Sequence, residues 1–289
     1  MTPPLESSGR SVDALIPDEI ARKAEAVGAQ KARMDFARLA VLAILGGAFI
    51  GLGAMFATTV LAGTSGAVPF GLSRLIAGVV FGTGLILVVV GGAELFTGNT
   101  LMVMALAARK ITLREMTRAW SIVYVGNLIG ALGTALLVFL SGQYLSGEGA
   151  VAQEALALAR AKVALPFDRA FFLGVLCNVL VCLAVWLSLG ARSTADKILA
   201  VLLPVAAFVA AGFEHSVANM YIIPLGLMIK DWGPANLWAQ IPFDATGLSG
   251  VTWGTFGWSL VPVTLGNIVG GGALVGGVYW FVYLRPRRN

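Results

Sequence analysis

Two short polar segments interrupt long apolar stretches of the sequence, and both contain residue types that can bind a solute or a proton. The first reads AELFTGNT at residues 93–100, and the second reads FEHSVAN at residues 213–219. The second segment holds His215, the only histidine of the chain. Ionisable side chains within apolar segments are costly and usually functional. Desolvation disfavours the imidazolium, and a neutral ring still donates a hydrogen bond to an anion, so we expect His215 to line a pore.

The acidic and amide side chains of these segments have a structural interpretation. If the apolar stretches are membrane helices, each polar segment breaks a helix and frees N–H and C=O groups that lipid cannot satisfy. Glu94 and Glu214 can accept hydrogen bonds from such N–H groups. A bare carboxylate would repel an anion, so we expect both glutamates to lie away from the pore. Other side chains that can satisfy the breaks are Thr97, Asn99, Ser216 and Asn219.

Composition indicates that most of the chain lies in a membrane. Of its 289 residues, 58% are hydrophobic and 12% are charged, whereas about a quarter of a soluble domain is charged. About 20 consecutive apolar residues cross a bilayer as a helix, and the sequence predicts six such spans. Four are continuous, at about 36–62, 120–140, 170–189 and 257–284. The second span starts near Ser73 and the fifth near Ile198, and each contains one of the polar segments.

The ends of the chain are more polar than its middle. The sequence divides into a cytoplasmic segment at 1–35, a six-helix pore domain at 36–285 and a cytoplasmic tail at 286–289. A helix is predicted from Pro17, with Ile20, Ala24 and Val27 on one face. This helix either lies on the membrane surface or packs beneath the bundle, or it is a solvated lead-in helix.

Basic residues fix the expected orientation, because positive charge gathers on the cytoplasmic side of membrane proteins. With both termini in the cytoplasm, 15 of the 20 Lys and Arg residues face inward. The five on the outer side are Arg74, Arg160, Lys162, Arg169 and Lys230. The charges gather at span ends and not along one face, which argues against nucleic acid as a partner.

The second half of the sequence repeats features of the first. Glu94 and Asn99 are matched by Glu214 and Asn219, each 120 residues later, and Gly-Asn-x-x-Gly occurs at 126–130 and again at 266–270. Because three crossings reverse the direction of the chain, the second copy of a three-span repeat is inverted in the membrane. Inverted repeats with broken helices put the transport site near the bilayer midplane. We therefore predict an all-α membrane protein of two inverted three-helix repeats, with spans 2 and 5 broken.

Four segments together resemble the formate/nitrite transporter family. They are GGAELFTGNTLMV, LVCLAVWLSLGARSTADK, GFEHSVANMYIIPLG and PVTLGNIVGGG, and the resemblance extends over about residues 36–285. We expect no cofactor and no metal. The resemblance implies a channel or transporter for small monovalent anions, an aquaporin-like protomer and a homopentamer. It also implies a bacterial inner membrane. The segments IPLG and ADKILAVLLPVAAFVAAGFEHS favour the formate branch, whereas nitrite and hydrosulfide remain open.

The resemblance also implies roles for single residues. His215 resembles the central pore histidine, Thr97 the pore threonine, and Lys162 the lysine that draws anions from the outer side. Asn178 resembles its neighbour on the fourth span, and Asn219 belongs to the second signature. Phe81 and Leu85 resemble a cytoplasmic constriction, while Leu95, Phe96 and Phe208 resemble a constriction beside the central chamber.

Other classes fit less well. Gly247–Gly250 resembles an intramembrane serine protease motif, but Ser249 falls in a predicted outer loop and His215 is poorly placed as its base. We therefore expect no enzymatic activity. The chain has no Asn-Pro-Ala pair and no second histidine, which disfavours aquaporins and ammonium channels. The anion crosses either in its charged form or, after taking up a proton, as the neutral acid, and the sequence leaves both routes open for a channel or a symporter.

Overall fold

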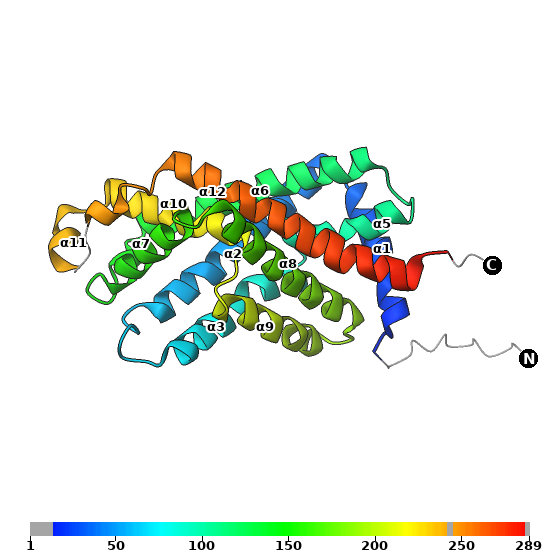
Figure 1. The fold of residues 1–289 in the computed structure, drawn as a ribbon, viewed down its shortest axis with the longest axis horizontal. Helices are drawn as coiled ribbons and strands as arrows, with labels where there is room; N and C mark the ends of the chain where they lie inside the picture. Colours follow the sequence, from blue (N-terminus) through cyan, green and yellow to red (C-terminus); the bar gives the residue numbers. More distant parts are fainter. Residues whose placement is uncertain (1–13, 242–244, 287–289) are drawn as a thin grey trace, which may run out of the picture.

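The structure, a computed structural model, describes residues 14–241 and 245–286, and every regular element in this part is helical. Figure 1 shows α7 and α11 at one end of the long axis, and α1 and α5 at the opposite end. Within the described residues, five helices are long and apolar enough to cross a membrane. They are α2 (Phe36–Leu61), α3 (Phe70–Gly91), α6 (Leu113–Leu140), α8 (Phe167–Gly190) and a last helix formed by α12 (Trp253–Asn267) with the π-helical segments η4 (Ile268–Gly277) and η5 (Trp280–Leu284).

The fifth predicted span consists of two half-helices. α9 (Thr194–Ala210) and α10 (Ser216–Trp232) have 17 residues each, fewer than the roughly 20 that cross a bilayer. The second predicted span breaks after α3 and continues as three short elements: α4 (Phe96–Asn99), η1 (Thr100–Met102) and α5 (Val103–Ala107). Both breaks lie within the polar segments identified in the sequence.

Glycines with positive φ end the helices that precede the two breaks. Gly92 has φ +83° after α3, and Gly212 has φ +73° after α9. Side chains with a Cβ rarely adopt this left-handed conformation, whereas glycine does so at little cost. The chain can therefore turn sharply at the same place in both repeats.

Capping residues explain why several helices start earlier than hydropathy alone predicts. α6 begins at Leu113 and not near Trp120, because Thr112 and Glu115 form a capping box. α10 begins at Ser216, inside the expected break, because the His215 ring caps it.

The packing follows the predicted repeat. α2 contacts α3 and α6 in the first half, as α8 contacts α9 and α12 in the second. α3 and α9 pack against each other and join the two halves. The repeat also extends to α1 (Pro17–Ala32) and α7 (Ala150–Val163): α1 packs on α5 and α8, while α7 packs on α10 and α2. α7 was not expected from the sequence. Smaller elements are η2 (Gln143–Leu145), α11 (Ala235–Gln240) and η3 (Ala245–Leu248).

Helix α1 packs beneath the bundle, which was one of the expected alternatives. Ile20, Ala21 and Ala24 are buried in a cluster with Trp186 of α8. Because α1 also contacts η5, the start and end of the described chain meet at one end of the molecule. The proposed division at residue 35 remains a prediction, and the tail at 286–289 lies largely outside the described residues.

Candidate functional site

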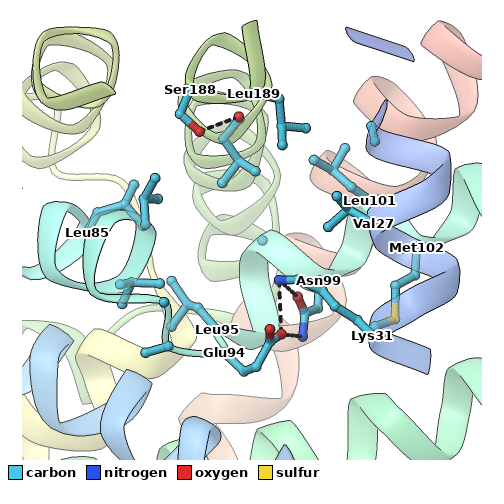
Figure 2. Close-up of a pocket in the computed structure, with 18 residues that line it drawn as sticks. Val27, Lys31, Leu85, Glu94, Leu95, Asn99, Leu101, Met102, Ser188 and Leu189 are labelled. Atoms are coloured by element: carbon cyan, nitrogen blue, oxygen red, sulfur yellow. Dashed lines mark hydrogen bonds and ion pairs between the residues drawn. The ribbon is translucent and has the colours of Figure 1, made fainter. Parts of the chain in front are cut away.

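A cavity of about 240 Å³ lies between α1, α3, α8 and the first break, and we call it the Lys31 pocket. Its polar lining includes Lys31, Glu94 and Asn99, which Figure 2 shows joined by hydrogen bonds and an ion pair. Its apolar lining includes Leu85 and Leu95, here named the leucine pair.

A second cavity of about 330 Å³ lies at the second break, and we call it the Lys162 pocket. His215 lines this cavity together with Phe81 and Phe208, here named the aromatic pair. Each pocket is several times larger than the roughly 30 Å³ that one water occupies, so a small solvated ion fits in either. The charged side chains of the Lys162 pocket are Arg74, Lys162, Arg169 and Glu214.

A lysine, a glutamate and an asparagine meet at each break, although Asn219 does not line the Lys162 pocket as Asn99 lines the Lys31 pocket. At the first break, Lys31 Nζ lies 2.9 Å from Glu94 Oε2, which also accepts a 2.8 Å bond from Asn99 Nδ2. Lys31 further donates to Asn99 Oδ1 at 3.0 Å.

At the second break, Lys162 Nζ lies 2.9 Å from Glu214 Oε1, and Asn219 Nδ2 donates to Glu214 Oε2 at 2.7 Å. Oδ1 of Asn219 is buried without a partner, which is a departure from the first pocket. The sequence showed the repeated Glu and Asn but not that a lysine from α1 or α7 joins each pair.

The expected hydrogen-bond partners of the two glutamates were wrong. Neither carboxylate accepts a hydrogen bond from a backbone N–H in the described residues; lysine and asparagine side chains occupy them instead. Both glutamates also line the pockets, although we expected them to lie away from the pore. Each carboxylate is paired with a lysine, and the position of the two glutamates relative to the pore remains a prediction.

Two asparagines that the sequence analysis did not single out for the site satisfy the backbone at the breaks. Asn127 of α6 donates from Nδ2 to the carbonyls of Ala43 and Glu94, and its Oδ1 accepts from Phe96 N. Asn267 of α12 makes the same three bonds in the second repeat, with Gly174 O, Glu214 O and Ser216 N. Both are fully buried. The repeated Gly-Asn-x-x-Gly motif carried this signal.

Thr97 of the first break meets His215 of the second; His215 lines the Lys162 pocket, whereas Thr97 lines neither pocket. Thr97 Oγ1 lies 3.1 Å from His215 Nε2, and both side chains are buried. Nδ1 of His215 accepts a 3.1 Å bond from Ala218 N, so a neutral ring carries its proton on Nε2. The Phe208 ring stacks on the imidazole with centroids 5.9 Å apart. The site therefore presents one N–H donor and one hydroxyl beside an aromatic wall.

Asn178 lines neither pocket and instead contacts the backbone of the first break. Its Nδ2 donates to Thr97 O, to Thr100 Oγ1 and to Asn267 O, at 3.2, 3.1 and 2.6 Å. These contacts tie the first break to α12, and they indicate a positioning role. The implied contact of Asn178 with a permeating ion remains a prediction.

The residues of the two constrictions implied by the family resemblance are distributed over both pockets in a different grouping. Phe81 packs edge-to-face on Phe208 at 5.7 Å and lines the Lys162 pocket, whereas Leu85 lines the Lys31 pocket. Phe96 lines neither; its ring packs on Trp120 and Tyr124. Leu95 has an extended backbone, so consecutive side chains at 95 and 96 point to opposite sides.

Comparison with known proteins gives one consistent result. Residues 18–281 match the family model described as "Formate/nitrite transporter". The formate channel FocA of Escherichia coli K12 is 44% identical over 94% of this chain and 96% of its own length. The uncharacterized transporter YrhG of Bacillus subtilis is 40% identical over 94% and 95%. The solved structure of a pentameric formate channel with formate bound has a TM-score of 0.82 and 41% identity, covering 86% of this chain and 98% of that one.

Proposed function

Because the chain belongs to the formate/nitrite transporter family, we propose that it is a formate channel of a bacterial cytoplasmic membrane that works as a homopentamer. Support comes from relatives described as formate channels and from a similar solved structure described as pentameric with formate bound. The family consists of membrane transport proteins and not of enzymes. The observation that carries the proposal is the contact of Thr97 at the first break with His215 in the lining of the Lys162 pocket, together with one lysine in each pocket.

The proposed route begins in the Lys162 pocket, where cationic side chains raise the local concentration of anions. The ion then passes the aromatic pair, where stripping its water costs several kcal/mol or more. Hydrogen bonds from His215 Nε2 and Thr97 Oγ1 offset part of this cost. The leucine pair forms the second apolar barrier, and the Lys31 pocket receives the ion. Apolar constrictions of this kind control passage by excluding water.

Proton exchange is a further part of the proposal. Nδ1 of His215 is occupied by the N–H of Ala218, so the ring can accept a second proton only by giving up the cap of α10. Protonation of His215 would therefore remove the cap of α10 and allow the second break to move. In this way pH would change the shape of the proposed route. Passage as an ion needs only the neutral ring.

The proposed orientation places both termini and the Lys31 pocket in the cytoplasm, and the Lys162 pocket outside. The distribution of Lys and Arg supports it. The Lys31 pocket depends on α1 as well as on residues 36–285, since α1 supplies Lys31.

The experiment that tests the proposal is uptake of formate, nitrite and hydrosulfide into proteoliposomes that contain the purified protein. We expect formate to enter fastest, with protein-free liposomes as the control for passive entry. Faster entry of nitrite or hydrosulfide would assign the chain to another branch of the family, and no uptake above control would overturn a channel function.

A further inference from the structure

The Lys162 pocket has an excess of positive charge that Lys162 alone does not explain. Three cationic side chains line it and Glu214 is the only carboxylate in its described lining. In the Lys31 pocket, by contrast, one lysine faces one glutamate. Since Lys162 is already paired with Glu214, the excess positive charge of the Lys162 pocket comes from Arg74 and Arg169.

Arg74 lies directly against the second break. Its Nη2 donates to Val209 O at 2.9 Å, which is one of the last carbonyls of α9. A Cβ added to Gly212 would lie 3.5 Å from the same nitrogen, so the guanidinium reaches the turn just before His215. A cation at this position also complements the negative end of the α9 dipole.

The guanidinium of Arg74 is incompletely paired. A guanidinium has five N–H donors, and Nε of Arg74 is buried without a hydrogen-bond partner. In the described part of the chain, no carboxylate lies within 4.0 Å of it. Burial raises the pKa of the Glu154 carboxyl on α7, and the nearby charge of Arg74 opposes part of this effect.

From this geometry we propose that Arg74 and Lys162 form an anion-binding site in the Lys162 pocket, with Arg169 at its mouth. The ligand class is a small carboxylate or a similar oxyanion, because guanidinium N–H groups match two adjacent oxygens whereas ammonium acts as a point charge. The site holds the anion before it reaches the aromatic pair. This inference rests on the proposed transport function and assigns it a further binding residue.

A blocking anion tests the site without relying on transport rates alone. Benzenesulfonate stays charged at neutral pH and its ring is wider than formate. We expect it to inhibit formate uptake into membrane vesicles whose outer face presents the Lys162 pocket. Arg74→Gln should raise the half-blocking concentration by roughly tenfold, the effect of losing a charged hydrogen-bond partner. Arg74→Lys should raise the half-blocking concentration by a smaller factor. Higher ionic strength should reduce the difference between each variant and the parent.

The controls separate this inference from the proposed function. Arg169→Gln removes an exposed charge at the mouth of the Lys162 pocket without touching α9. We expect it to raise the half-blocking concentration of benzenesulfonate about threefold. Arg114→Gln removes an exposed arginine that lines neither pocket and should change nothing. If Arg74→Gln does not assemble, Arg74→Lys and Arg169→Gln decide the question. Equal half-blocking concentrations in all variants would overturn the site, whereas absence of formate uptake in the parent would overturn the proposed function.

Discussion

Lys162 Nζ lies 2.9 Å from Glu214 Oε1, and both side chains are largely buried, with exposed fractions of 14% and 5%. Lys31 and Glu94 form the equivalent pair in the Lys31 pocket. Each lysine therefore has two tasks: it neutralises a carboxylate at a helix break, and it presents positive charge to a pocket. Replacing a lysine alone affects both tasks at once.

A paired substitution separates these tasks. Lys162→Met leaves Glu214 buried without its cation, and breaking such a pair costs about 3 kcal/mol. We expect a lower melting temperature in detergent together with reduced formate uptake. Lys162→Met combined with Glu214→Gln removes both charges, so stability should recover while the concentration for half-maximal uptake stays raised. If uptake by the double variant matches the parent at low ionic strength, Lys162 does not attract the anion.

The asparagines at the breaks allow an isosteric test. Asn127→Asp keeps the shape of the side chain but points a carboxylate oxygen at the carbonyls of Ala43 and Glu94. Each buried acceptor left without a donor costs about 1–3 kcal/mol. We expect reduced thermal stability and loss of formate uptake, and the same from Asn267→Asp.

A control on the same helix distinguishes the break from general packing. Thr134→Val removes a buried hydrogen bond to Gly130 O within α6 and touches neither break. It should leave formate uptake close to that of the parent. Normal uptake by Asn127→Asp would show that the position of the first break does not depend on this amide.

Orientation can be tested by thiol labelling, since Cys177 and Cys182 are buried and should not react. Ser146 is exposed and follows η2, which packs on α7, whereas Arg114 is exposed and precedes Glu115, which pairs with Arg33 at the end of α1. Ser146→Cys and Arg114→Cys therefore probe opposite ends of the molecule (Figure 1). We expect an impermeant maleimide added to intact cells to label position 146 and not position 114, with both labelled after lysis. Labelling of position 114 in intact cells would reverse the proposed orientation.

The sequence predicted the helices and breaks well because hydropathy and polar interruptions are local signals. α7 was missed because AVAQEALALARAKV is short and amphipathic, so its hydropathy does not predict a membrane-spanning helix. The Lys31–Glu94 pair was missed because it joins α1 to a break that follows α3, a contact that depends on tertiary packing. The packing of Phe96 on Trp120 and Tyr124 was not evident for a similar reason, since the direction of its side chain depends on the extended backbone at Leu95.

His215 combines two functions that a suitable pair of variants can separate. Its Nδ1 caps α10 through Ala218 N, and its Nε2 faces Thr97 Oγ1. Asparagine is a favoured N-cap residue and its amide can also donate, but it does not titrate. Phenylalanine can neither cap, donate nor bind a proton.

We therefore expect His215→Asn to conduct formate at a reduced rate and to lose the pH dependence of the parent, while His215→Phe loses most uptake, roughly tenfold or more. The measurement is formate uptake into proteoliposomes at about pH 5–8, which brackets the titration of an ordinary histidine. Stability in detergent is measured in parallel, so that loss of the α10 cap is distinguished from loss of the donor. An unchanged pH profile in His215→Asn would remove proton exchange from the role of His215. Normal uptake by His215→Phe would mean that the route does not pass between Thr97 and His215.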